Sequence, residues 1–207
     1  MLTKLHRDIA LQLFDIEAIK FGQFKLKLHE KNPDAPLSPI YIDLRILRSF
    51  PDVMDAAVKI YKYMTNGITF DLYADVPTAV TPLVAVLSHE TRIPMISPRI
   101  KEKAYGIGSA IDGVYQTGQI AIVVDDLITR ADSKLDAISL LEENGLVVKD
   151  IVVLINREQG GPEELAKKGY ICHSAFKLTE ILGFYRDVGK IDEKVYNQII
   201  DYILGNR

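Results

Sequence analysis

Hydrophobic and polar positions in the first third of the chain predict two helices and two short strands. Residues 4–20 carry apolar side chains at helical spacing, which is typical of an amphipathic helix. Residues 21–27 alternate apolar and polar side chains, and residues 39–44 form a second short apolar run after a proline-marked loop. Both segments favour strands. Residues 51–65 predict a helix that opens with proline, a residue favoured in the first helical turn.

The middle of the chain predicts a parallel sheet. Four short runs are rich in valine, isoleucine and aromatic residues: 70–76, 93–96, 119–124 and 151–155. The segments 80–91 and 132–144 between these runs have a helical pattern. Strands that are almost continuously apolar and alternate with helices indicate an α/β fold with a buried, mainly parallel sheet. The tail, residues 178–204, predicts one or two further helices.

One long segment interrupts this order. Residues 98–118 are polar, contain four glycines and show no clear period. A loop of about 20 residues is uncommon inside a compact domain and is usually functional or disordered. We therefore expect a mobile loop here.

Composition narrows the setting rather than the function. The chain has 207 residues, of which 48% are hydrophobic and 26% charged, as in ordinary globular domains. The net charge of −3 provides no overall field for nucleic acid, so any anion needs a local site. The single cysteine, Cys172, fits a reducing compartment. No apolar run approaches the ~20 residues of a membrane helix, and the acidic N-terminal segment does not resemble a signal peptide. We expect a cytoplasmic protein without a nucleic-acid or membrane partner.

The strongest chemical signal lies in residues 119–138. An apolar strand is predicted to end at Asp125 and Asp126, and a short turn then leads into a helix. Ligands of open parallel sheets bind outside the carboxyl ends of the strands, and a helix N-terminus favours phosphate. Thr129 and Ser133 add hydroxyl donors. The segment therefore predicts a ligand with both hydroxyls and phosphate, accompanied by a divalent cation.

Two other interpretations compete with that site. In the first, Asp132 only caps the helix and the acidic pair is solvated. In the second, the acids belong to a phospho-receiver domain of doubly wound topology. A receiver needs a lysine at the end of a late strand, whereas this chain has Asn156 and Arg157. The long loop also has no place in a receiver.

Four segments in order resemble one enzyme family. They are FGQFKLK followed by SPIYIDLR, then RIKEKAYG at 99–106, VVDDLITRADS, and INREQGG at 155–161. VVDDLITRADS resembles the phosphoribosyl-diphosphate (PRPP) signature of type I phosphoribosyltransferases. Together the segments resemble orotate phosphoribosyltransferases, and most of all the orotate half of bifunctional UMP synthases. The resemblance covers about residues 10–204.

The resemblance implies a fold and a reaction. It implies one phosphoribosyltransferase domain over residues 1–207, with an N-terminal hood over about 1–45 and a mobile catalytic loop over 98–118. Its central, mainly parallel sheet would be flanked by helices. The implied reaction joins orotate to PRPP, giving orotidine 5′-monophosphate and diphosphate with Mg²⁺ as cofactor. The partners implied are these small molecules and a second copy of the chain, in a homodimer that shares the loop across its interface.

The same resemblance implies roles for individual residues. PRPP would be bound by Arg99, Lys101, Lys103, Tyr105, Asp125, Asp126, Thr129, Arg130, Ala131, Asp132 and Ser133. Orotate would be bound by Lys27, Tyr41, Thr129 and Arg157. The catalytic residues would be Lys103, Lys27, Asp126 and Arg99. Mg²⁺ would have no direct protein ligand and would be held by PRPP, with Asp125 and Asp126 nearby.

Several positions depart from the family pattern. Ala131 stands where glycine is usual, so its Cβ is expected to narrow the phosphate turn or to exclude a positive φ. Asp132 adds a carboxylate beside the expected phosphate, and Ile100 replaces the usual loop lysine. Thr78 stands in the predicted pyrophosphate turn, where tyrosine is common. These departures keep an alternative open: a catalytically weak or inactive relative that retains the fold for nucleotide binding or regulation.

Overall fold

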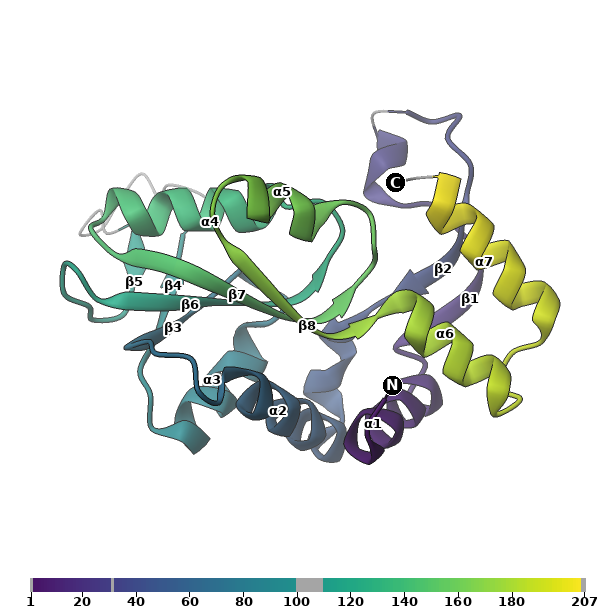
Figure 1. Ribbon diagram of the computed structural model, residues 1–207, viewed down its shortest axis with the longest axis horizontal. Helices are drawn as coiled ribbons and strands as arrows, with labels where there is room; N and C mark the ends of the chain where they lie inside the picture. Colours follow the sequence, from purple (N-terminus) through teal and green to yellow (C-terminus); the bar gives the residue numbers. More distant parts are fainter. Residues whose placement is uncertain (1, 31, 100–109, 206–207) are drawn as a thin grey trace.

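The computed structural model describes residues 2–30, 32–99 and 110–205, and its centre is a six-stranded sheet (Figure 1). The strand order is β5-β4-β3-β6-β7-β8. The strands are β3 (Leu72–Asp75), β4 (Met95–Pro98), β5 (Ile111–Asp112), β6 (Ile120–Ile128), β7 (Val147–Asn156) and β8 (Ile171–Lys177). All neighbours run parallel except β4 and β5, which pair antiparallel. The sheet confirms the predicted α/β class.

Helices cover both faces of this sheet. Helices α2 (Pro51–Thr65) and α3 (Thr81–Thr91) lie on one face, and α4 (Asp132–Glu143) and α5 (Gly161–Lys167) lie on the other (Figure 1). Helix α1 (Lys4–Asp15) packs against α2. This arrangement leaves the carboxyl ends of β3, β6 and β7 along one edge, where the loops to the next helices begin.

A small second sheet stands beside the main one. Strands β1 (Ile19–Phe24) and β2 (Ser38–Ile42) pair antiparallel, and helix α7 (Glu193–Gly205) packs on β2. Helix α6 (Leu178–Asp187) connects this part to β8 (Figure 1). Two short 3₁₀ helices, η1 (Lys27–Glu30) and η2 (Leu44–Ser49), flank β2 along the chain.

The alternation of side chains along β6 decides which face each residue serves. Ala121 and Val123 belong to the core cluster that includes residues of α4, whereas Ile122 and Val124 belong to the cluster that includes residues of α2. Successive side chains of a strand point to opposite faces, and this alternation holds from Ala121 to Val124. It changes near the end of the strand, where Leu127 packs against the α2-side cluster and Ile128 belongs to the α4-side cluster.

The structure corrects several predicted boundaries. The predicted helix 51–65 is confirmed, and the helices 80–91 and 132–144 are confirmed to within one residue at their ends. The first helix ends at Asp15, because the chain turns through Glu17 at φ 56° before β1. The strand predicted over 119–124 runs to Ile128, so the prediction that it ends at the acidic pair was wrong.

Three elements were missed. Helix α5 and strand β8 follow the last predicted strand, and β5 lies within the segment that was expected to be a loop. β8 is an edge strand whose residues are mostly half-buried, and its Ile171 is 58% exposed, so it lacks a continuous apolar run. Among the residues that the structure describes, no helix is long and apolar enough to cross a membrane.

Candidate active site

The two acids of the predicted site lie within β6 and differ in their surroundings. Asp125 is 5% exposed and forms an ion pair with Lys134 of α4. Asp126 is half-buried and lines a pocket on the α2 side of the sheet. Burial, and then the Asp125 charge, raise the pKa of Asp126 to about 7. The acidic pair is therefore divided between the interior and the pocket.

The phosphate turn lies between β6 and α4. In this turn Thr129 is half-buried and Arg130 is exposed. Ala131 is the residue immediately before the helix. No side chain caps this helix, so its first N–H groups remain directed toward the turn. Asp132 and Ser133 are exposed in the first helical turn. The interpretation of Asp132 as a capping residue was therefore wrong.

Ala131 does not require a positive φ in this turn. Its φ is −90° and its ψ is 0°, which any L-residue can adopt. The side chain is 2% exposed and belongs to the core cluster on the α4 face. Of the two effects expected from the Cβ, the exclusion of a positive φ has no bearing here, because the turn enters the helix through an ordinary backbone conformation. The expected narrowing of the phosphate turn stays a prediction.

Arg157 lies at the carboxyl end of β7 and is held against the phosphate turn. The backbone N–H of Arg157 donates to the Ile128 carbonyl at 2.9 Å, and the backbone N–H of Gly161 donates to the Thr129 carbonyl at 2.9 Å. A Cβ on Gly161 would lie 2.7 Å from that carbonyl oxygen, so only glycine permits this approach. The two loops therefore form one rigid unit.

The guanidinium of Arg157 is buried without full compensation. The residue is 8% exposed, and its Nε has no hydrogen-bond partner among the described residues. Burial lowers the pKa of the Arg157 guanidinium. The carboxylate of the neighbouring Glu158 accepts a hydrogen bond of 2.9 Å from the backbone N–H of Thr179, in the first turn of α6. A buried cation with an unused donor is suited to an anionic ligand.

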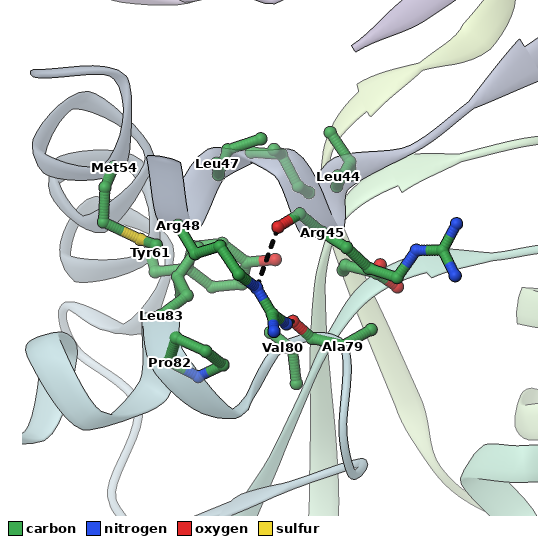
Figure 2. Close-up of a pocket in the computed structure, with 12 residues that line it drawn as sticks. Leu44, Arg45, Leu47, Arg48, Met54, Tyr61, Ala79, Val80, Pro82 and Leu83 are labelled. Carbon is green, nitrogen blue, oxygen red and sulfur yellow. Dashed lines mark hydrogen bonds between the residues drawn. The ribbon is translucent and has the colours of Figure 1, made fainter. Parts of the chain in front are cut away.

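A pocket on the α2 face joins Asp126 to residues that the sequence did not suggest (Figure 2). It is lined by Leu44, Arg45, Leu47, Arg48, Met54, Tyr61, Ala79, Val80, Pro82, Leu83, Asp126 and Leu154. Arg48 spans its mouth, since Nε donates to the Arg45 carbonyl at 2.9 Å and a terminal nitrogen donates to the Ala79 carbonyl at 3.4 Å (Figure 2). Arg48 thus connects η2 with the predicted pyrophosphate turn.

Tyr41, predicted to bind orotate, does not line this pocket but contacts Arg45, which does. The Tyr41 hydroxyl accepts a hydrogen bond from Arg45 at 3.0 Å, and its ring centroid lies 5.6 Å from that of Phe24. Arg45 also holds Asp43 through two hydrogen bonds of 2.6 and 2.8 Å. The Lys27 side chain lies outside the described part of the structure. These contacts do not test whether Tyr41 lines the orotate pocket, so that role stays a prediction.

Arg99 stands at the base of the predicted catalytic loop. Its guanidinium forms a bidentate ion pair with Asp112 of β5. The backbone N–H of Arg99 donates to the Ala110 carbonyl at 2.8 Å. In this structure Arg99 is therefore engaged with β5 rather than directed at the acidic pair. Lys101, Lys103 and Tyr105, together with Ile100, lie outside the described residues.

Two buried charged residues near the site were missed. Lys134, in the first turn of α4, is 4% exposed. Its burial was not indicated by the sequence, because a lysine in a helical pattern is usually exposed to solvent. Asp75 ends β3 with no exposed surface, and it accepts a hydrogen bond from the Thr81 hydroxyl. Burial raises the pKa of Asp75. The burial of Asp75 follows from the pairing of β3 with β6, in which Asp75 lies beside Val124. This pairing is known from the structure.

Curated relatives cover most of the chain. It is 34% identical to an orotate phosphoribosyltransferase of Pyrobaculum aerophilum over 93% of this chain and 96% of that one. It is 32% identical to the uridine 5′-monophosphate synthase of Bos taurus over 94% of this chain but only 40% of that longer protein. The chain therefore spans less than half of its bifunctional relatives. No family model matches the chain.

Solved structures share the fold. The UMP synthase of Leishmania donovani superposes with a TM-score of 0.84 and 32% identity, over 95% of this chain and 42% of that one. Orotate phosphoribosyltransferase from Aeropyrum pernix superposes with a TM-score of 0.72 and 24% identity, over 87% of this chain and 99% of that one. The fold is that of the type I phosphoribosyltransferases. The chain belongs to the orotate phosphoribosyltransferase family.

Proposed function

We propose that this chain transfers the phosphoribosyl group of PRPP to N1 of orotate, giving orotidine 5′-monophosphate and diphosphate. The observation that carries the proposal is the buried Arg157 guanidinium with its unpartnered Nε, fixed beside the phosphate turn. Orotate is a planar carboxylate, and a guanidinium fork recognises such a group through paired hydrogen bonds.

The residues around the turn support a role for PRPP. The α4 N-terminus and the hydroxyls of Thr129 and Ser133 suit the 5′-phosphate, with Arg130, Ala131 and Asp132 forming the rest of the turn. Asp126 suits the ribose hydroxyls, because its carboxylate lines a pocket and it precedes the phosphate turn by three residues. The C1–N1 bond would form as the bond from C1 to diphosphate breaks. Catalysis of this kind depends on positioning and on stabilising the diphosphate charge.

Positive charge for the diphosphate would come from Arg99 and from Lys101, Lys103 and Tyr105 of the loop, with Lys27 reaching toward both substrates. The loop over 98–118 would come from the partner in a homodimer, and the hood over about 1–45 would cover the base. Tyr41 would line the orotate pocket. We propose one domain over residues 1–207.

Mg²⁺ fits this site as an ion carried by the substrate. Among the described residues, no group of three or more acidic, histidine or cysteine side chains could hold a metal. Asp126, whose carboxylate lines the pocket, is a hard oxygen donor suited to an ion that keeps most of its ligands from phosphate and water. Mg²⁺ would neutralise the charge that develops on the leaving diphosphate.

The alternative of a weakly active, nucleotide-binding relative is favoured by one observation. Two groups expected to meet PRPP are engaged within the protein, since Asp125 pairs with Lys134 and Arg99 pairs with Asp112. Such a protein would bind PRPP without turning it over.

An assay with purified protein, orotate, PRPP and Mg²⁺ separates the two functions. Turnover is expected, measured as the loss of orotate absorbance, with adenine as the control base that should not react. Calorimetry with PRPP gives the second measurement. Binding of PRPP without loss of orotate would favour the alternative, and neither binding nor turnover would refute both.

A further inference from the structure

Lys134 occupies a position that is unfavourable for a lysine. It lies in the first turn of α4, where the helix dipole disfavours a cation, and it is only 4% exposed. Burying an ammonium group is costly unless nearby groups compensate it. Its partners therefore show what the lysine is there to hold.

Those partners lie on both sides of Asp126. The Lys134 ammonium pairs with the carboxylate of Asp125 and donates to the Leu127 carbonyl at 2.7 Å. The Asp125 carboxylate in turn accepts the Asp126 N–H at 2.8 Å. One buried cation thus fixes the residues immediately before and after the pocket-facing acid.

The Asp126 carboxylate lies beside that of Asp125, near the Lys134 charge. Asp125 pairs with Lys134 of α4, whereas Asp126 lines the pocket on the α2 side of the sheet. The Asp126 carboxylate accepts the Leu127 N–H at 2.7 Å, so its direction follows the local backbone. On the α2 face, the Tyr61 hydroxyl donates to the Asp125 carbonyl at 2.6 Å. The backbone that carries Asp126 is therefore held from both faces of the sheet.

We infer that Lys134 is a positioning residue for PRPP, which fixes the Asp126 carboxylate toward the ribose through Asp125 and the Leu127 carbonyl. Asp125 then serves the interior ion pair, and Asp126 alone meets the ribose hydroxyls. This inference rests on the proposed function, and it gives the two acids of the motif different tasks.

Two variants separate positioning from a purely structural role. Lys134→Met removes the ammonium and leaves a buried carboxylate uncompensated, so Tm falls, and the KM for PRPP rises about tenfold as Asp126 loses its support. The double variant Asp125→Asn with Lys134→Met removes both charges. Its Tm should recover toward the wild-type value, while its KM for PRPP stays raised about tenfold because both anchors are still missing. The KM for orotate should change much less in both variants.

A purely structural lysine gives a different result. In that case the KM for PRPP would recover together with Tm in the double variant, and this outcome would overturn the inference. If Lys134→Met does not fold, the double variant alone decides in the same way. Lys167→Met is the matched control, because Lys167 forms an exposed pair with Glu164 at 2.6 Å, and neither Tm nor KM should move.

The outcome is distinct from failure of the proposed function. If wild-type protein neither binds nor consumes PRPP, the proposed function fails before any variant is compared. If wild-type protein is active and the double variant has the wild-type KM for PRPP, only the role of Lys134 is wrong.

Discussion

Replacing Arg157 with methionine tests whether its guanidinium exists for a ligand or for the fold. Methionine fills a similar volume without charge, and the site is 8% exposed with an unpartnered Nε. Burial lowers the pKa of the guanidinium, which means that folding disfavours its charged form at every pH below that pKa. Arg157→Met should therefore increase stability and abolish efficient use of orotate.

The sizes of both effects follow from the contacts. A buried donor without a partner costs about 1–3 kcal/mol, so its removal should stabilise the protein by a similar amount. At about 2–4 °C per kcal/mol for a chain of this size, Tm should rise by roughly 2–12 °C. The loss of charge-assisted hydrogen bonds to the orotate carboxylate should cost about 2–4 kcal/mol, which lowers kcat/KM for orotate by ~30- to 1,000-fold.

Calorimetric unfolding and steady-state kinetics measure these effects on the same samples. Orotate should raise the Tm of the wild-type protein and leave that of Arg157→Met unchanged. Arg7, an exposed arginine of α1, is the matched control, and Arg7→Met should leave both Tm and kinetics near the wild-type values. A fall in Tm with orotate use retained would show that Arg157 supports the fold instead.

Three other changes test the phosphate turn and the acidic pair. Ala131→Gly should lower stability by about 1–2 kcal/mol in thermal unfolding, because it removes a buried methyl group and loosens the backbone before α4; an increase in Tm would contradict this packing. The pKa of Asp126, raised from 3.8 to about 7, favours the neutral carboxyl in the folded state, so the free energy of unfolding should fall as pH rises through that range. kcat/KM for PRPP should rise with pH toward and through about 7 as the carboxylate forms, and Asp126→Asn should lose both dependences; a pH profile shared by wild type and variant would exclude Asp126 as the titrating group. Tyr61→Phe removes the hydrogen bond to the Asp125 carbonyl and should cost about 1–2 kcal/mol in denaturant unfolding with a raised KM for PRPP; an unchanged KM would show that the contact from the α2 face does not affect Asp126.

The sequence predicted the sheet well because its central strands are buried on both faces. Such strands form continuous apolar runs, and the flanking helices have clear boundaries, as with Pro51 at the start of α2. β8 was missed because an edge strand with an exposed Ile171 has no such pattern. The end of β6 was misplaced because acidic residues usually mark a loop, whereas here a partner on α4 compensates one of them.

The candidate site was predicted in composition but not in arrangement. One motif contained the acids and the turn, which are adjacent along the chain, and Arg157 was suggested by a separate segment, residues 155–161. Neither the separation of Asp125 from Asp126 nor the contribution of Arg48 was visible, because both depend on contacts between segments distant in sequence. Arg48 donates to a carbonyl that lies 31 residues away along the chain.

The contact between Gly161 and Thr129 has a consequence for the evolution of this protein. The loop that carries Arg157 and the turn that suits the phosphate share two backbone hydrogen bonds and an approach that excludes any side chain at Gly161. A change in one loop must therefore be transmitted to the other, and substitutions across the contact should be non-additive. Under the proposed function, base preference and phosphate affinity would be inherited together, and altering the base specificity of this scaffold would require compensating changes in both loops.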